Sequence, residues 1–153
     1  MAVDDLSKVP GLTGAQKAAI AAYVNQNKRE DVKGSRSQPS AQVVPLATYS
    51  TRASFYRGSA LMWTRDNVDF GYDYSKVVWT SPYQECGWIF PNMAWNLGYT
   101  KYYDTTQNDR FRFQNRIGAG VVTPWGDVTL YTQDFTHRIS VWHDGYWSAW
   151  ADN

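Results

Sequence analysis

The chain contains one cysteine and two histidines, and these are the residues with the chemistry that catalysis would need. Cys86 precedes His143 and the acids Asp144 and Asp152, the order that a cysteine–histidine–aspartate arrangement requires. His137 and His143 lie six positions apart on one expected strand, too far apart to share a metal ion without further ligands. The sequence therefore leaves one enzymatic hypothesis, a cysteine-dependent hydrolase or acyltransferase around Cys86. It predicts no cofactor and no metal.

The segment around Cys86, YQECGW at residues 83–88, resembles the nucleophile segment of transglutaminases and papain-like proteases. Those families place the cysteine on a helix. Here Pro82 and Pro91 bracket the cysteine, so a helix at this place would have to be short. A lone cysteine is more often a small buried apolar residue. We therefore keep the enzyme as the alternative and prefer a protein that is not an enzyme.

Aromatic residues are the next candidates, because they make up 16% of the chain and include eight tryptophans. Asp144-Gly145 is a strong signal for a two-residue hairpin turn. In such a hairpin Trp142 would face Trp147, so that the two indoles lie side by side on one face. If the pair is exposed, it forms a flat platform for a sugar ring, a base or a partner's side chain. If it is covered, it belongs to the core, and the sequence leaves both interpretations open.

Residues 110–122 (RFRFQNRIGAGVV) alternate between apolar and polar side chains. Apolar residues occupy odd positions, whereas Arg110, Arg112 and Arg116 occupy even positions. This period of two predicts a strand with one buried face and one wet face. Arginines two positions apart are separated by about 6.7 Å, which is comparable with the spacing of phosphates or acidic sugar units. The arginine stripe is thus either an anion-binding ladder or a solvated face paired with Asp and Asn.

Residues 4–27 contain the segment for which a helix is expected. Thr13 and Gln16 form a capping-box pattern, and residues 15–24 are rich in alanine. Ile20, Tyr23 and Val24 give the helix a narrow apolar stripe. An isolated helix of this length is marginal in water. We therefore expect residues 1–40 to dock on a protein partner or on a neighbouring subunit.

The same segment resembles the helix-hairpin-helix motif of DNA-binding proteins over about a seventh of the chain. The resemblance rests on Leu6, Val9, Pro10-Gly11-Leu12, Ala15, Ala19-Ile20 and Tyr23. It implies a hairpin loop whose backbone amides hold a phosphate. Thr13 stands where the family has its second glycine, which departs from the motif. A nucleic-acid-binding protein that uses this hairpin and the basic linker is therefore a second alternative.

The domain organisation follows from the change in composition along the chain. We expect a helical arm at residues 1–27, a polar linker at 28–46 and one antiparallel β domain at 47–153. Eight or nine short strands without intervening helices predict a mainly β fold, a single antiparallel β-sandwich or barrel. Residues 81–97, with two prolines, are expected to be the least regular part of this domain.

Charge and composition narrow the function further. The net charge of +1 selects neither nucleic acid nor an anionic membrane, and no apolar run of about 18 residues predicts a transmembrane segment. The richness in Trp, Tyr, Asn and Thr favours a secreted or surface-exposed protein over a cytoplasmic one. The preferred function is a non-enzymatic binding or assembly module that recognises a protein partner or a carbohydrate. Its expected contact surface consists of aromatic residues and arginines: Trp125, Trp142, Tyr146, Trp147, Arg110, Arg112 and Arg116.

Overall fold

A computed structural model describes residue 6 and residues 8–26, 29–32 and 47–152 of the chain. It contains one helix, α1 (Gly14–Asn25), and eight strands within these residues. The strands are β1 (Arg29–Val32), β2 (Tyr49–Ser59), β3 (Met62–Tyr72), β4 (Val77–Trp88), β5 (Asn92–Asp104), β6 (Asn108–Thr123), β7 (Gly126–Trp142) and β8 (Trp147–Ala151). In the described part of the chain no helix is long and apolar enough to span a membrane.

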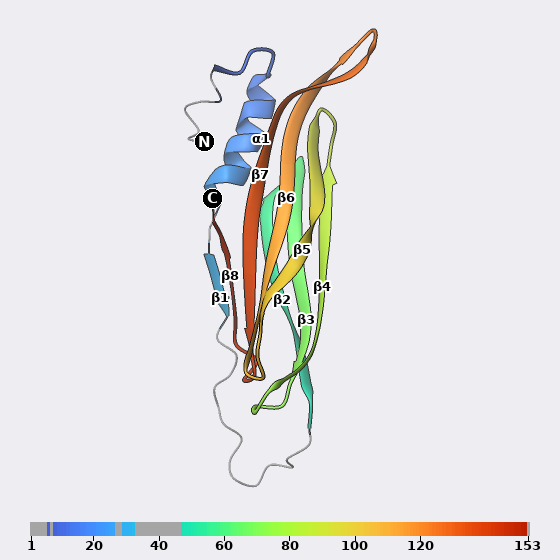
Figure 1. The fold of residues 1–153 in the computed structure, drawn as a ribbon. Helices are drawn as coiled ribbons and strands as arrows, with labels where there is room; N and C mark the ends of the chain where they lie inside the picture. Colours follow the sequence, from blue (N-terminus) through green and yellow to red (C-terminus); the bar gives the residue numbers. More distant parts are fainter. Residues whose placement is uncertain (1–5, 7, 27–28, 33–46, 153) are drawn as a thin grey trace.

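The strands form two antiparallel sheets that lie face to face (Figure 1). One sheet has the order β1-β8-β7-β6-β5 and the other the order β2-β3-β4. This arrangement confirms the predicted mainly β fold and selects the sandwich over the closed barrel. From β2 to β8, consecutive strands run in opposite directions, so their connecting turns alternate between the two ends of the sandwich (Figure 1).

The segment 81–97 is regular, and the expectation of an irregular region there is wrong. Residues 77–88 form β4 and residues 92–104 form β5, with a turn between them. Pro82 pairs with Val68 of β3 and lies on β4, which is an edge strand of its sheet. Proline is tolerated at an edge because the missing N–H does not interrupt a ladder on the outer side. The two prolines therefore mark an edge strand and a turn.

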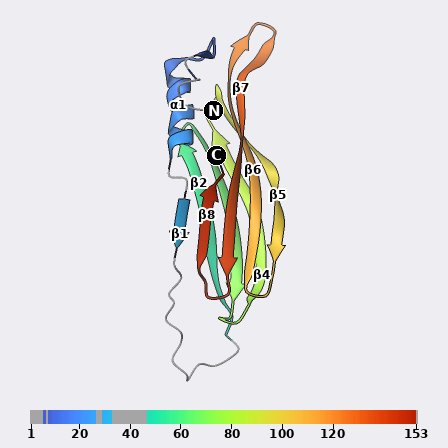
Figure 2. The same ribbon diagram turned by 60° about the vertical axis from the view of Figure 1, so that its left-hand side comes forward.

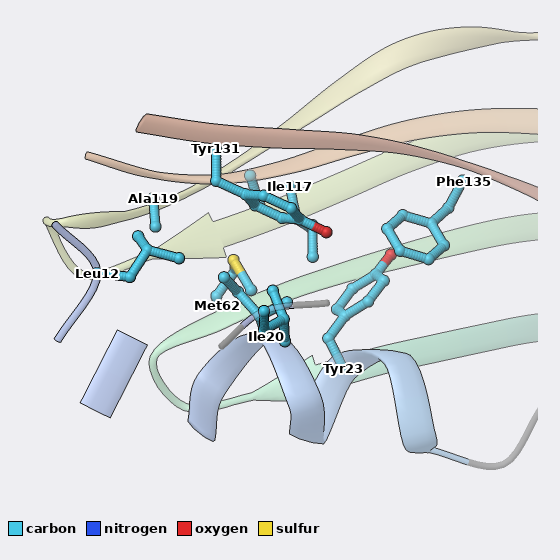
Figure 3. Packing of buried hydrophobic residues seen from close by; sticks show 10 residues of the cluster. Leu12, Ile20, Tyr23, Met62, Ile117, Ala119, Tyr131 and Phe135 are labelled. Atoms are coloured by element: carbon cyan, nitrogen blue, oxygen red, sulfur yellow. The ribbon is translucent and has the colours of Figure 1, made fainter. Parts of the chain in front are cut away.

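The buried apolar residues form two clusters at different heights in the sandwich. The strand cluster consists of Ala53, Phe55, Val68, Phe70, Phe111, Phe113, Ile139, Val141, Trp147 and Ala149. The helical cluster consists of Leu6, Leu12, Ile20, Tyr23, Met62, Ala94, Ile117, Ala119, Tyr131 and Phe135. The strand cluster fills the space where the two sheets face each other. In the helical cluster, side chains of α1 point into the interior and meet the strands (Figure 3).

Helix α1 begins at the predicted capping box. The backbone N–H of Gln16 donates to Thr13 Oγ1 at 3.2 Å, and the backbone N–H of Thr13 donates to Gln16 Oε1 at 2.7 Å. The Gln16 side chain also donates to the backbone oxygen of Gly120 in β6 at 2.8 Å. Ile20 and Tyr23 are fully buried against the sheets. The apolar stripe is thus used within the chain itself, which removes the physical reason for expecting it to dock on a partner.

A buried arginine from β2 binds the backbone carbonyls at the C-terminal end of α1. The Arg57 guanidinium donates from Nε to the backbone oxygen of Tyr23 at 2.9 Å and from Nη2 to that of Val24 at 3.1 Å. These carbonyls belong to the last turn of α1, which leaves them without helical partners. The last turn of α1 contains no basic residue. Arg57 of β2 therefore supplies the positive charge at this end of the helix.

Residues 29–32 are also part of the sandwich, although the sequence places them in a linker. They form β1, which pairs with β8 so that Arg29 lies opposite Trp150 and Glu30 opposite Ala149. Figure 2 shows β1 following α1 along the edge of the five-stranded sheet. Residues 33–46 of the predicted linker lie outside the described residues. The helical arm and the β domain therefore share one core, and the boundary predicted between them does not separate two structural units.

Candidate binding groove on the five-stranded sheet

The outer face of the five-stranded sheet carries a groove formed by four neighbouring strands. The strand register places Arg110, Ser140 and Ser148 in one row across β6, β7 and β8. The groove has a volume of about 450 Å³. Its lining combines two arginines, two indoles and two hydroxyls: Arg29, Arg110, Ser140, Trp142, Ser148 and Trp150, with Ala151 beside them.

Arg110 is held in a defined position at this groove. Its Nε donates to Asn108 Oδ1 at 2.7 Å, and its guanidinium lies 4.7 Å from the centre of the Tyr103 ring. Asn108 is itself anchored, because its side-chain amide donates to the backbone oxygen of Val141 at 2.9 Å. Stacking on an aromatic ring and one fixed hydrogen bond orient the planar guanidinium while it keeps further N–H donors.

The hairpin between β7 and β8 has a different register from the predicted one. The backbone N–H of Trp142 donates to the Tyr146 oxygen at 2.9 Å, so the loop has three residues, 143–145, in place of two. Gly145 takes a φ of +80°, the left-handed position that closes such a loop. Trp147 therefore pairs with Val141 and not with Trp142. A shift of one residue sends a side chain to the opposite face of the sheet.

The predicted pair of tryptophans is consequently wrong. Trp147 is 7% exposed and belongs to the strand cluster. Trp142 stays on the outer face and packs against Tyr146, with ring centres 4.6 Å apart. The second indole of the groove is Trp150, which the sequence analysis did not select. Arg29, Ser140 and Ser148 were also missed, because only the pairing of β1, β8 and β7 brings them beside Arg110.

The arginine stripe on β6 has the predicted alternation. Phe111 and Phe113 are buried, whereas Arg112 between them and Gln114 after them are exposed. The arginines nevertheless differ in their surroundings. Arg112 lies 5.5 Å from the centre of the Tyr102 ring, and that ring also meets Arg138 at 5.2 Å.

Arg116 binds an acid of the neighbouring strand. Its Nε and Nη2 donate to the two Asp134 oxygens at 2.6 and 2.9 Å. The Arg116 hydrogen bond lowers the pKa of the Asp134 carboxyl, and Asp134 in turn raises the pKa of Arg116. Arg116 is thus neutralised by a partner, and of the three stripe arginines Arg110 is the one that lines the groove.

Trp125 lies far from the groove. It occupies the turn between β6 and β7 and is 93% exposed. Trp142 is at the opposite end of β7, which is 17 residues long and therefore spans about 55 Å if fully extended. The seven residues of the expected contact surface do not form one surface. Arg110 and Trp142 meet at the groove, Tyr146 supports Trp142, and Trp125 marks a separate region.

Cys86 lies within strand β4 and has the surroundings of a structural residue. Its Sγ donates to the backbone oxygen of Ala94 at 3.6 Å, and the side chain packs against the helical cluster. Burial raises the pKa of the thiol, which disfavours the reactive thiolate. His143 lies in the loop at the far end of β7, where its Nδ1 is 2.8 Å from the Tyr74 oxygen. Among the described residues, no group of three or more His, Cys, Asp or Glu is placed to hold a metal ion.

An Asp–His pair does exist, but it is enclosed between the two clusters. His137 Nδ1 is 2.6 Å from Asp66 Oδ2, and both side chains have no exposed surface. His137 Nε2 is 3.3 Å from Arg57 Nη1. Arginine can only donate, so Nε2 accepts and the ring proton on Nδ1 is donated to Asp66. Asn115 also donates to Asp66 Oδ2, at 2.8 Å.

This buried network has a structural role. It connects β3, β6 and β7 to the carbonyls at the end of α1 through Arg57. A substrate has no route to groups with no exposed surface, so the Asp–His pair does not form an active site. Buried polar groups that bind one another in this way fix the relative position of the elements that carry them.

Comparison with known proteins yields no match: no family model, no curated protein and no solved structure matches the chain. The assignment of the groove therefore rests on its residues and their geometry.

Proposed function

We propose that the protein is a non-enzymatic binding module that recognises an acidic carbohydrate in the groove of the five-stranded sheet. The supporting observation is the composition of that groove, in which Trp142 and Trp150 lie with Arg29 and Arg110. Indole rings stack on the apolar faces of sugars, and guanidinium groups bind carboxylates through paired hydrogen bonds. The two kinds of side chain together fit a sugar ring that carries a carboxylate.

The size of the groove is compatible with the same class of ligand. Ser140 and Ser148 also line it, but they are 1% and 3% exposed, so the ligand contacts are assigned to the indoles and the guanidinium groups. The volume of about 450 Å³ lies within the range of roughly 300–1,000 Å³ that is common for ligand sites. Of the two classes of ligand that the sequence suggests, a carbohydrate fits a small groove lined by indoles better than a protein surface does.

The outer face of the three-stranded sheet provides an internal comparison. It has a hollow with similar residue types, lined by Ser50, Thr51, Arg52, Asp69 and Trp79. There, however, Asp69 accepts from Arg52 at 2.6 and 3.1 Å, so the guanidinium is already bound to a carboxylate. Trp79 lies against the backbone of Gly71, where an added Cβ would be 2.2 Å from the indole nitrogen. The comparison therefore pairs Arg52, which is bound to a carboxylate, with Arg110, whose hydrogen bond goes to the neutral amide of Asn108.

The test is calorimetric titration with an oligosaccharide of uronic acids and with a neutral oligosaccharide of the same length. The wild-type protein should bind the acidic ligand more tightly. Trp142→Ala should weaken binding of the acidic ligand about ten- to a hundredfold, as expected for the loss of one stacking ring. Arg110→Gln should remove the preference for the acidic ligand and reduce the dependence of affinity on salt.

The matched controls are Trp79→Ala and Arg52→Gln on the other sheet, which should leave the affinity unchanged. A thermal melt of each variant checks that the domain remains folded. The proposal is wrong if neither oligosaccharide binds, or if the control variants weaken binding as much as the groove variants do.

A further inference from the structure

One end of the sandwich exposes apolar side chains that the core does not use. They lie on or beside three hairpin turns, β2–β3, β4–β5 and β6–β7, and we call them the apolar end. Its members are Leu61, Trp88, Ile89, Phe90, Val122, Trp125 and Val128. The exposed fractions of Ile89, Val122 and Trp125 are 57%, 67% and 93%.

Backbone hydrogen bonds join the β4–β5 turn to the β2–β3 turn and to strand β6. The Ile89 N–H donates to the Leu61 oxygen at 2.9 Å, which joins the β4–β5 turn to the β2–β3 turn. The Gly120 N–H donates to the Pro91 oxygen at 2.9 Å, which joins the β4–β5 turn to β6. Beyond this contact the β6–β7 hairpin continues past the neighbouring turns, so that its tip is the part of the apolar end that projects furthest (Figure 1, Figure 2). A projecting hairpin is suited to entering the headgroup region of a lipid bilayer.

The Thr123 hydroxyl binds two backbone groups at the tip of this hairpin. Thr123 Oγ1 donates to the Gly126 oxygen at 2.7 Å and accepts from the Trp125 N–H at 3.3 Å. Pro124 has no N–H to satisfy. A backbone polar group that enters an apolar medium without a partner costs several kcal/mol, and these contacts lower that cost.

The charge of the apolar end points to the kind of surface. Residues 60–62, 88–92 and 121–129 contain one charged residue, Asp127, and no lysine or arginine. Anionic lipids attract lysine and arginine, which these three turns lack. Tryptophan is enriched at the boundary between lipid headgroups and acyl chains, where its ring is apolar and its N–H remains wet.

We propose that the apolar end docks on a zwitterionic lipid bilayer, with Trp125 and Val122 entering the headgroup region first. The groove of the five-stranded sheet lies near the other end of β7, so docking leaves it open to solvent. The docking does not depend on the ligand of the groove.

The experiment is co-flotation of the full chain with vesicles of phosphatidylcholine. The wild-type protein should float with the vesicles and should do so equally at 0.1 and 1 M salt, because screening weakens only charge-driven binding. Trp125→Ala should lower the partition coefficient by about tenfold, since one large apolar side chain no longer enters the interface. Trp125 is 93% exposed, so this substitution should leave the melting temperature unchanged.

A matched pair of valines supplies the control. Val122→Ser should weaken flotation, whereas Val78→Ser should not, because Val78 is 42% exposed but lies near the start of β4, at the other end of the sandwich. Trp142→Ala should also leave flotation intact, which separates this proposal from the one for the groove. The proposal is overturned by absence of flotation with phosphatidylcholine, by binding only to vesicles that contain phosphatidylserine, or by equal losses in the two valine variants.

Discussion

The strand cluster is built from strands alone, whereas the helical cluster is completed by residues of α1 that belong to a different part of the chain. In the strand cluster, Phe111 and Phe113 of β6 face Phe55 and Phe70 of the other sheet. In the helical cluster, Ile20 and Tyr23 fill the corresponding space (Figure 3). One sandwich therefore uses two ways to cover the inner faces of its sheets.

The boundary between the strand cluster and the helical cluster is polar, in contrast to the two clusters themselves. Arg57 lies 4.6 Å from the centre of the Phe135 ring and 4.9 Å from that of the Tyr23 ring, while it reaches His137 on its other side. The pKa of Arg57 is lowered by burial, although the nearby Tyr23 counteracts this. The helix is thus attached through one buried cation as well as through apolar contacts, and the two modes of attachment can be separated by mutation.

A large loss of stability is expected from Arg57→Ala. The change leaves the last carbonyls of α1 without donors. It also removes the cation that balances the buried Asp66 carboxylate through His137, which contacts both residues. Breaking a buried charged network by removing one partner typically costs about 3–5 kcal/mol of unfolding free energy. Urea denaturation measures this loss.

The control for Arg57 is Arg52→Ala, which removes an exposed arginine paired with Asp69. It should change the urea midpoint little, because solvent screens that pair. If Arg57→Ala behaves like Arg52→Ala, the polar boundary does not hold the helix to the sheets.

A smaller and more local effect is expected from Ile20→Ala, which truncates a fully buried side chain of α1 and should cost about 2–5 kcal/mol. Hydrogen exchange should then show protection lost first in residues 14–25, with β6 and β7 still protected. Phe113→Ala, in the strand cluster, should cost about 3–5 kcal/mol and lower protection in both sheets together. Uniform loss of protection in both variants would mean that the two clusters unfold as one unit.

The smallest effect concerns pH, at the edge of the helical cluster. Burial raises the pKa of the Cys86 thiol in the folded protein, so the fold favours the protonated form. This contribution to stability is complete below the unfolded pKa of about 8.5 and is lost as pH rises through the folded pKa. Unfolding free energies measured between about pH 8 and 10 should therefore decline, and Cys86→Ser should remove that part of the slope. An unchanged slope in the variant would assign the decline to other groups.

The same comparison explains which parts of the fold the sequence could predict. The strand cluster is visible in the alternation of Phe111 and Phe113 with arginines, because the period of a strand is two. The helix is visible in its capping box and its alanines. That Ile20 and Tyr23 complete the core between the sheets has no local signal, since a stripe of apolar residues fits any apolar surface.

The residues of the groove were predicted less completely than the core. Arg110 and Trp142 were identified from residue type and alternation, but Trp147 was placed on the wrong face because a three-residue loop replaced the predicted two-residue turn. Trp150 and Arg29 required the pairing of β8 with β1, across more than a hundred residues of sequence. Such pairing depends on long-range contacts that no window of sequence contains.

The sequence by itself determined the fold class, the helix with its cap and the alternating strand that carries Arg110. The tertiary structure decided which outward side chains become neighbours, and it placed Trp142 and Trp150 in one groove and the turn with Ile89 against the turn with Leu61. The physical reason is that local periodicity decides whether a side chain faces inward or outward. Strand register and the order of strands in the sheet decide what it faces there.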